Sequence, residues 1–276
     1  MGAGFSSYQI LYHHQNRITL PFAYSPPPPT RKDNRNDTRV EILASYNGLL
    51  LLGIGQKDHF LWNPSTRSYK RISCNFYHQI DSFRMYGLGY ESSSNAYKVI
   101  RIVRVVVNWG VAPNTHHNFP SYDSTTVKVH NSRTNFWRSI TDFPYKTFVD
   151  QQGLLVNGAP HWIVTRAESE EYVIIYFDLV EEKFKELGKP NWLVSDSAFC
   201  LGVFNGLLTL LRNANDEVWV MKEHGVKDSW TKLITKDKSM LYESNYDVRI
   251  RPFQERFAFQ RVEYVESLVS PHIERE

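Results

Sequence analysis

The sequence is poor in cysteine and has no long uninterrupted apolar segment. Its 276 residues include two cysteines, Cys74 and Cys200, which are too few for a disulfide framework or a cysteine-based metal site. The longest apolar runs, such as residues 49–54, fall far short of the ~20 residues that a membrane-spanning helix needs. We therefore expect an intracellular protein, cytoplasmic or nuclear, with no membrane span.

An excess of one charge is also missing. The 32 lysines and arginines are scattered among 29 aspartates and glutamates, which leaves a formal net charge of +3 at pH 7. A nucleic-acid surface needs basic residues that cluster on one face. We therefore expect no nucleic-acid partner.

The short motifs of catalysis and cofactor binding are absent from the sequence as well. It contains no P-loop, no GxSxG, no HExxH and no paired CxxC. The glycines at 53–55 and 87–89 lack the third glycine of a dinucleotide fingerprint, so we interpret them as strand bends. The histidine pairs at 13–14 and 116–117 have no third ligand at a useful spacing. We expect a protein that is not an enzyme and that binds no cofactor or metal.

Two N-terminal segments carry weaker signals. Residues 1–6 fit the loose pattern for myristoylation of Gly2, but the pattern is short and one acyl chain anchors only weakly, so no lipid is the default expectation. Residues 25–38 combine a proline run with polar residues. They predict a stiff exposed loop in preference to a ligand for an aromatic groove.

The positive evidence begins with three Asn-Gly dipeptides, at residues 47–48, 157–158 and 205–206, each between two apolar runs. Asn-Gly suits a two-residue type I′ turn, because both positions need a positive φ and the twist of this turn matches that of the strands. Each dipeptide therefore predicts a β-hairpin.

A second kind of hairpin recurs along the chain and ends on an aromatic residue followed three positions later by an aliphatic one. The pairs are Tyr69/Ile72, Trp137/Ile140, Phe184/Leu187 and Trp230/Leu233. Together the two hairpins make a unit of four antiparallel strands in about 45–50 residues, which is the period of a propeller blade. The aromatic residues would wedge between neighbouring blades. The predicted blade anchors are Trp62, Tyr69, Trp137, Phe184, Trp219 and Trp230.

These repeats predict an all-β fold, a β-propeller with about five to six four-stranded antiparallel blades. Strand-like sequence near both ends of the chain would form one composite blade that closes the ring. We expect residues 1–276 to form a single domain.

Residues 108–125 interrupt the second unit between its second and third strands, and this insertion is the best candidate for function. In a propeller such a connection shares a face with the crossings between blades, and loops on a rigid ring are where recognition usually occurs. Aromatic side chains lead the list of interface anchors. The expected partner-binding residues on this face are Phe76, Tyr77, Trp109, His117, Phe119, Tyr122, Phe143, Tyr145 and Trp192. The alternative for each of them is that it folds back to cover the end of a blade.

Several stretches taken in order, including "LWNPSTRSYKRI", "YGLGYESSSNAYKVIRI", "VKVHNSRTNFWRSI" and "FDLVEEKFKEL", resemble the F-box-associated domain (type 1) of plant F-box proteins, a kelch-like β-propeller family. The resemblance implies the substrate-receptor role of an SCF-type (cullin–RING) ubiquitin ligase. In that family an N-terminal F-box binds the ligase adaptor, and the propeller holds the target protein that is to be ubiquitinated.

The sequence departs from the family pattern at two places. The F-box would precede residue 1 and is absent here, so binding to the adaptor is expected only where an F-box is supplied upstream. The segment after Ile234 is short, which predicts one incomplete blade. The alternatives are a carbohydrate-binding or carbohydrate-active kelch-like propeller, which would need carboxylates or metal ligands lining the channel, and a truncated, non-functional product of the family.

Overall fold

The computed structural model describes residues 9–12, 16–19, 40–54, 58–73, 82–107, 122–148, 153–191, 193, 199–212, 217–233 and 267–272. Within these ranges the regular structure is β-strand, apart from one turn of 3-10 helix, η1 (Lys227–Ser229). The same ranges contain no helix with the length and apolar content that crossing a membrane requires.

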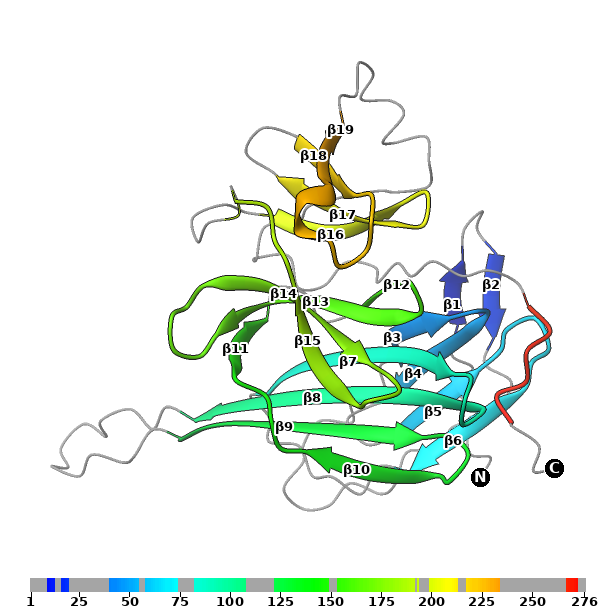
Figure 1. Cartoon of the computed structure of the whole chain (residues 1–276). Helices are drawn as coiled ribbons and strands as arrows, with labels where there is room; N and C mark the ends of the chain where they lie inside the picture. The colour runs from blue at the N-terminus through cyan, green and yellow to red at the C-terminus, as the bar shows by residue number, and fades with distance from the viewer. Residues whose placement is uncertain are drawn as a thin grey trace, which may run out of the picture.

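The strands form consecutive antiparallel sheets, as Figure 1 shows. Blade 1 consists of β3 (Val40–Tyr46), β4 (Leu49–Ile54), β5 (Asp58–Trp62) and β6 (Tyr69–Ser73). Blade 2 consists of β7 (Ser82–Glu91), β8 (Ala96–Val107), β9 (Tyr122–Asn131) and β10 (Phe136–Ile140). Blade 3 consists of β11 (Tyr145–Phe148), β12 (Leu154–Val156), β13 (Ala159–Arg166), β14 (Tyr172–Asp178) and β15 (Lys183–Leu187), with β11 and β12 both paired to β13. Blade 4 consists of β16 (Phe199–Phe204), β17 (Leu207–Arg212), β18 (Glu217–Met221) and β19 (Trp230–Leu233).

This arrangement confirms the predicted all-β propeller fold, with each blade following the last along the chain. The expected closing blade is described only in part. Strands β1 (Gln9–Tyr12) and β2 (Asn16–Thr19) pair with each other. Residues 267–269, the end of the predicted C-terminal strand sequence, are not in a strand. The rest of that sequence, the loop at 25–38 and the short segment after Ile234 lie outside the described residues, so the total number of blades remains a prediction.

The three Asn-Gly turns have the predicted geometry. Asn47, Asn157 and Asn205 have φ values of 42°, 49° and 49°, and the glycine after each also has a positive φ. Each turn joins two strands that pair directly, β3 with β4, β12 with β13 and β16 with β17. The inner hairpins were therefore readable from local backbone chemistry.

Several outer hairpins share a turn device of their own. In three of them an Asn or Asp side chain accepts hydrogen bonds from the backbone N–H groups two and three residues further on, and these residues are Asn63, Asn131 and Asp178. The side chain satisfies the turn where the ladder of β-sheet bonds stops. The motifs "NPSTR", "NSRTN" and "DLVEE" are thus one structural solution used three times.

The core lies between blades, because alternate residues of each strand face opposite neighbours. On β7, Met85 packs in the cluster shared with blade 3 while Tyr86 packs in the cluster shared with blade 1. On β8, Ile100 and Val99 divide in the same way. Full burial of one such side chain contributes roughly 1.5–3 kcal/mol. Each blade therefore depends on the next one to cover its apolar face.

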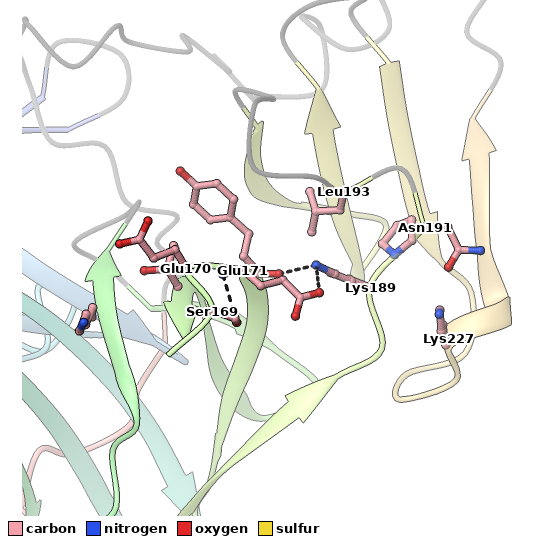
Figure 2. Close-up of a pocket in the computed structure, with 11 residues that line it drawn as sticks. Ser169, Glu170, Glu171, Lys189, Asn191, Leu193 and Lys227 are labelled. Carbon is pink, nitrogen blue, oxygen red and sulfur yellow. Dashed lines mark hydrogen bonds and ion pairs between the residues drawn. The ribbon is translucent and has the colours of Figure 1, made fainter. Parts of the chain in front are cut away.

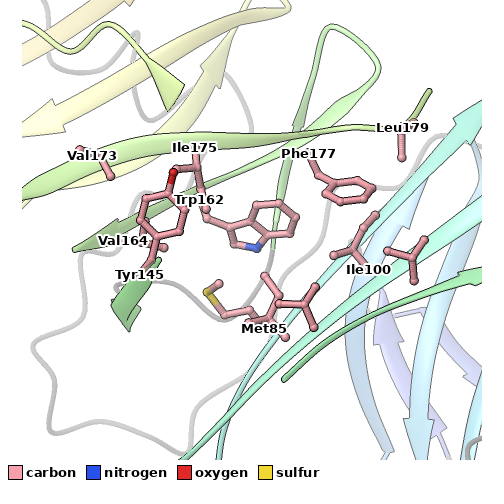
Figure 3. Close-up of a cluster of buried hydrophobic side chains, with 12 residues drawn as sticks. Met85, Ile100, Tyr145, Trp162, Val164, Val173, Ile175, Phe177 and Leu179 are labelled. Carbon is pink, nitrogen blue, oxygen red and sulfur yellow. The ribbon is translucent and has the colours of Figure 1, made fainter. Parts of the chain in front are cut away.

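Trp162 lies at the centre of the interface between blades 2 and 3, and no sequence pattern had singled it out. Figure 3 shows its indole between β13 and the Met85 side of blade 2. This packing explains why position 87 is a glycine, because a Cβ there would lie 2.7 Å from the indole of Trp162. Gly87 permits close packing, which corrects its interpretation as a strand bend.

The predicted anchors occupy different environments. Trp230 is 8% exposed in the cluster shared by blades 3 and 4, and its indole N–H donates to the carbonyl of Gly188 at 2.8 Å. The side chains of Trp137, Phe184 and Trp219 are half-buried against the three clusters between blades. Trp62 is fully buried, whereas Tyr69 is the exposed member of the set, at 39%, with its ring edge against Phe60.

The C-terminal residues 267–272, here called the C-terminal strap, lie beside blade 1 (Figure 1). The side-chain amide of Asn63 donates to the carbonyls of Ser267 and Val269, at 2.8 and 2.6 Å. The Ser267 hydroxyl donates to the carbonyl of Asn47 at 2.9 Å. The strap thus joins the end of the chain to the first four-stranded blade.

Candidate functional site

The connections of each blade fall on two opposite faces, because neighbouring strands are antiparallel. The Asn-Gly turns lie on one face. The links from second to third strand and the crossings between blades lie on the other, here called the loop face. Most of the predicted partner-binding residues belong to long connections outside the described residues. These are Phe76, Tyr77, Trp109, His117, Phe119 and Trp192.

The structure places the remaining members of the predicted set in or near strands. Tyr122 is the first residue of β9. Phe143 is half-buried and packs edge-on against Phe184 and Tyr145, with ring centroids 4.9 and 5.1 Å apart. It therefore covers the end of the cluster between blades 2 and 3.

Tyr145 requires a correction, because it does not lie in an exposed crossing. It begins β11, which pairs with the edge of β13, and its side chain is 6% exposed inside the core cluster. Its hydroxyl donates to a carboxylate oxygen of Glu186 at 3.2 Å. Tyr145 is a core residue with one polar bond and is not a surface for a partner.

A groove of about 820 Å³ opens between blade 3 and blade 4 (Figure 2). Its walls come from β11, the β13–β14 turn, the crossing after β15 and η1 of blade 4. The lining residues are Lys146, Thr165, Ser169, Glu170, Glu171, Tyr172, Lys189, Pro190, Asn191, Leu193 and Lys227. The turn and the crossing belong to the loop face, whereas η1 lies in the link between the third and fourth strands of blade 4.

A chain of ion pairs fixes one wall of the groove. The ammonium of Lys189 lies 2.6 Å from Oε1 of Glu171, and the guanidinium of Arg166 lies 2.6 Å from its Oε2. Arg166 also pairs with Glu186 at 2.5 Å. The ammonium of Lys189 lowers the pKa of Glu171, and the hydrogen bond from Arg166 lowers the pKa of Glu186. Both carboxylates are therefore ionised and already matched by cations.

The floor of the groove is less polar than its walls. Leu193 is 1% exposed, and Pro190 and Thr165 are buried. The ring of Tyr172 stands edge-on to Phe199 of blade 4, with centroids 5.0 Å apart. These side chains support the groove from below, and the surface that it exposes is mainly polar and charged.

A pair of histidines joins the same two blades at another point. Nε2 of His161 lies 3.0 Å from Nε2 of His224, while Nδ1 of His161 donates to the carbonyl of Ala159 at 2.8 Å. Burial and, to a lesser degree, the neighbouring His224 lower the pKa of His161 to about 4. Both rings are neutral near pH 7, so one can donate its N–H to the other. The pair is a structural contact between blades.

The groove offers binding chemistry and no evident catalytic constellation. Across the described ranges, no three His, Cys, Asp or Glu side chains converge in a way that could hold a metal ion. The carboxylate of Glu171 is tied to two cations, whereas a glycosidase pair needs two carboxylates that converge on one substrate. The lysines of the groove were not predicted, although Lys189 lies in a crossing that had been assigned to the loop face.

Residues 10–270 match the family model of the F-box associated beta propeller domain. The chain is 29% identical over 208 residues to F-box/kelch-repeat protein At3g23880 of Arabidopsis thaliana, a match that covers 71% of this chain and 52% of that protein. F-box protein CPR1 of the same plant is 31% identical over 223 residues and is matched over 72% of this chain and 52% of its own length. The chain therefore spans about half the length of the curated relatives it matches.

Among solved structures, dipeptidyl peptidase 4 of Porphyromonas gingivalis is similar with a TM-score of 0.43 and 6% sequence identity. This similarity covers 78% of the present chain and 32% of that protein.

Proposed function

Because the chain belongs to the family of F-box associated β-propeller domains, we propose that it is a protein-recognition module whose loop face holds a target protein for ubiquitination. The single observation that carries the proposal is the family match over residues 10–270. The groove supports it, because exposed polar and charged side chains suit a peptide or protein surface.

The proposed module binds and does not catalyse. Ubiquitin transfer would be carried out by the SCF-type ligase, whose adaptor binds an F-box when one is joined upstream of the propeller. The module itself needs no cofactor and no nucleic acid in this role. It would act inside the cell, in the cytoplasm or the nucleus, and residues 1–276 would serve as one propeller domain.

The proposal can be tested by comparing variants of the two faces. The loop-face variant carries Trp109→Ala and Phe119→Ala. The matched control carries Phe136→Ala and Val180→Ala, which change side chains that are 69% and 68% exposed on the opposite face. Each form is expressed in plant cells with an F-box joined upstream, and captured proteins are quantified by mass spectrometry together with their ubiquitination.

We expect the unchanged chain and the Phe136/Val180 variant to capture and ubiquitinate the same proteins. The loop-face variant should lose both readouts while its thermal unfolding stays the same. Equal capture by all three forms, or capture that is lost only in the control, would remove the loop face from the proposed function. Capture without any gain in ubiquitination would contradict the ligase role.

A further inference from the structure

The three Asn-Gly turns share one dipeptide and one backbone conformation but differ in their surroundings. Asn47, Asn157 and Asn205 have φ values of 42°, 49° and 49°, and all three are exposed. Each dipeptide lies between the last paired residues of its hairpin. The three turns therefore carry the same reactive groups, and only their neighbours can make one turn react faster than another.

An asparagine followed by a glycine can lose its side-chain amide without an enzyme. The main-chain nitrogen of the glycine attacks Cγ of the asparagine and gives up its proton to the solvent, while the amide nitrogen takes up a proton and leaves as ammonia. The resulting succinimide ring is opened by water to aspartate or isoaspartate. One water is consumed and one ammonia is released, so no further reactant is needed. Glycine favours the attack because it has no Cβ to obstruct the nitrogen.

The closed turn protects the asparagine from this reaction. The first central residue of a type I′ turn has a ψ of roughly +30°, which turns the attacking nitrogen away from the asparagine side chain. The peptide group between the two residues must therefore rotate before the ring can form. The rate at each turn then depends on how often it opens locally, and on which bonds the opening would break.

The turns at Asn157 and Asn205 are open to solvent. Both residues of each dipeptide are exposed, and a Cβ placed on Gly158 or Gly206 would meet no atom within 4 Å. Among the residues that the structure describes, neither asparagine side chain has a hydrogen-bond partner. These two turns can therefore open without breaking contacts outside their own hairpins.

The C-terminal strap covers the third turn. Gly48 is buried, and the Ser267 hydroxyl donates to the carbonyl of Asn47 at 2.9 Å. That carbonyl belongs to the same peptide group as the attacking nitrogen of Gly48. Asn63 in turn holds the strap through its bonds to Ser267 and Val269. Rotation of this peptide group therefore breaks the bond to the strap, which the other two turns do not have.

We propose that Asn157 and Asn205 are sites of spontaneous deamidation in the folded protein, and that the C-terminal strap protects Asn47 from the same reaction. The inference goes beyond the proposed function, since the reaction needs no partner protein. Each conversion adds one negative charge to the face of the Asn-Gly turns, opposite the loop face.

Modification at Asn157 would also loosen blade 3. Isoaspartate adds a methylene to the main chain, and a two-residue turn that is longer by one atom shifts the pairing of Val156 with Ala159. Strand β12 has three residues and little pairing to spare. The carbonyl of Gly158 lies 3.4 Å from the position that a Cβ on Gly89 would take, so the same turn packs on blade 2.

Two other asparagines serve as internal references. Asn95 and Asn135 have φ values of 48° and 56°, but the residue after each carries a Cβ. Their side chains are also engaged, because Oδ1 of Asn95 accepts from the Tyr90 hydroxyl at 2.8 Å and Oδ1 of Asn135 accepts from Nε2 of His130 at 3.1 Å. Both should deamidate more slowly than the two open Asn-Gly turns.

The test measures deamidation site by site. The purified chain is incubated at mildly alkaline pH in heavy-oxygen water and digested, and each asparagine is quantified by peptide mass spectrometry. The heavy oxygen enters when the ring opens, so it separates deamidation in the folded protein from deamidation during digestion. Synthetic peptides of residues 43–51, 153–161 and 201–209 give the rate of each dipeptide without the fold, and we expect these three rates to be similar.

In the folded chain we expect Asn157 and Asn205 to react at least about tenfold faster than Asn47. Ser267→Ala removes the bond to the Asn47 carbonyl and should raise the rate at that site about fivefold, without changing the other two. Ser270→Ala is the matched control, because this exposed serine of the same strap accepts from the N–H of His272 and should leave all rates unchanged.

Two results would overturn the proposed sites: equal protection of all three dipeptides relative to their peptides, or rates at Asn157 and Asn205 no higher than those at Asn95 and Asn135. The protective role of the strap is wrong if Ser267→Ala leaves the rate at Asn47 unchanged. It is also wrong if the two serine variants raise that rate equally.

Discussion

The ammonium of Lys98 lies 2.7 Å from a carboxylate oxygen of Glu182, and this contact joins β8 of blade 2 to the β14–β15 turn of blade 3. The same ammonium lies 2.7 Å from Glu91 and donates to the carbonyl of Leu179 at 2.6 Å. All three of its protons are thus engaged, and the side chain is 4% exposed. Arg138 contacts the other oxygen of Glu182. Blades 2 and 3 are therefore held together by a buried cation as well as by the apolar cluster.

Replacing this lysine should destabilise the protein strongly. Lys98→Met leaves two carboxylates without their shared cation, and breaking a buried ion pair from one side costs about 3–5 kcal/mol of unfolding free energy. Urea unfolding measures the change. Lys185→Met is the control, because Lys185 pairs with Asp178 and Glu181 but its side chain is 34% exposed. We expect at most about 1 kcal/mol for the control, and similar losses in the two variants would contradict the role of Lys98.

The same cluster predicts a loss of stability in acid. Burial alone would raise the pKa of Glu91, but hydrogen bonds from Lys98, Ser93 and Ser94 outweigh it and lower the pKa from 4.5 to about 2. A carboxyl group with a depressed pKa contributes stability that is complete above its unfolded pKa and is lost as the pH falls through its folded pKa. The contribution of Glu91, about 3 kcal/mol, should therefore disappear between about pH 4.5 and pH 2.

Glu91→Gln isolates this effect, because the amide has no charge to lose. The variant should be less stable than the unchanged protein at pH 7, and the gap in unfolding free energy should close as the pH falls below 4.5. Thermal or urea unfolding at a series of pH values provides the measurement. A gap that is constant across this range would show that the charge of Glu91 does not stabilise the fold.

Replacing Trp230 tests how strongly blade 4 is held to blade 3. Trp230→Phe keeps an aromatic ring in the shared cluster but removes the donor to the carbonyl of Gly188, which should cost about 1–3 kcal/mol. Trp230→Ala also leaves a cavity, and we expect about 3–5 kcal/mol. Urea unfolding ranks the two variants. An alanine variant no less stable than the phenylalanine variant would mean that the indole contributes through its hydrogen bond alone.

The sequence predicted those parts of the structure that depend on local chemistry. The turn at Asn47 follows from the positive φ that Asn-Gly accepts, and the alternation of Met85 and Tyr86 follows from the pleat of a strand. Polar contacts between blades were not predictable in this way. Lys98 meets Glu182 only because two blades stack in one register, and nothing near either residue in the sequence signals that register.

The candidate site also depends on how strands and blades pack, which the sequence does not reveal. Tyr145 and the groove are two examples. Tyr145 follows a proline and was expected in a crossing, but β11 pairs with the edge of β13 and draws the ring into the core. Lys189 and Lys227 lie far apart along the chain and belong to different blades, so only the packing of those blades brings them to one groove. The partner-binding role of the aromatic residues in the long loops stays a prediction.

Replacing Asn63 tests how the C-terminal strap is held to blade 1. It is fully buried and uses both ends of its amide, since Oδ1 accepts from the N–H groups of Ser65 and Thr66 and Nδ2 donates to the carbonyls of Ser267 and Val269. Asn63→Asp keeps both acceptor bonds, removes both donor bonds and directs a negative charge at two carbonyl oxygens. We expect a loss of about 2–3 kcal/mol in unfolding free energy and faster proteolysis near the C-terminal strap.

Asn131→Asp is the matched control for this change. Asn131 forms the same turn in blade 2, where Oδ1 accepts from the N–H groups of Arg133 and Thr134, but its side chain is not fully buried and the strap does not reach it. Because a carboxylate serves this turn as well as an amide does, the control should lose less than about 0.5 kcal/mol and leave proteolysis unchanged. Equal losses in the two variants would mean that the turn matters at Asn63 and the strap does not. A loss confined to Asn63→Asp would assign the stabilisation to the two donor bonds that join the C-terminal strap to blade 1.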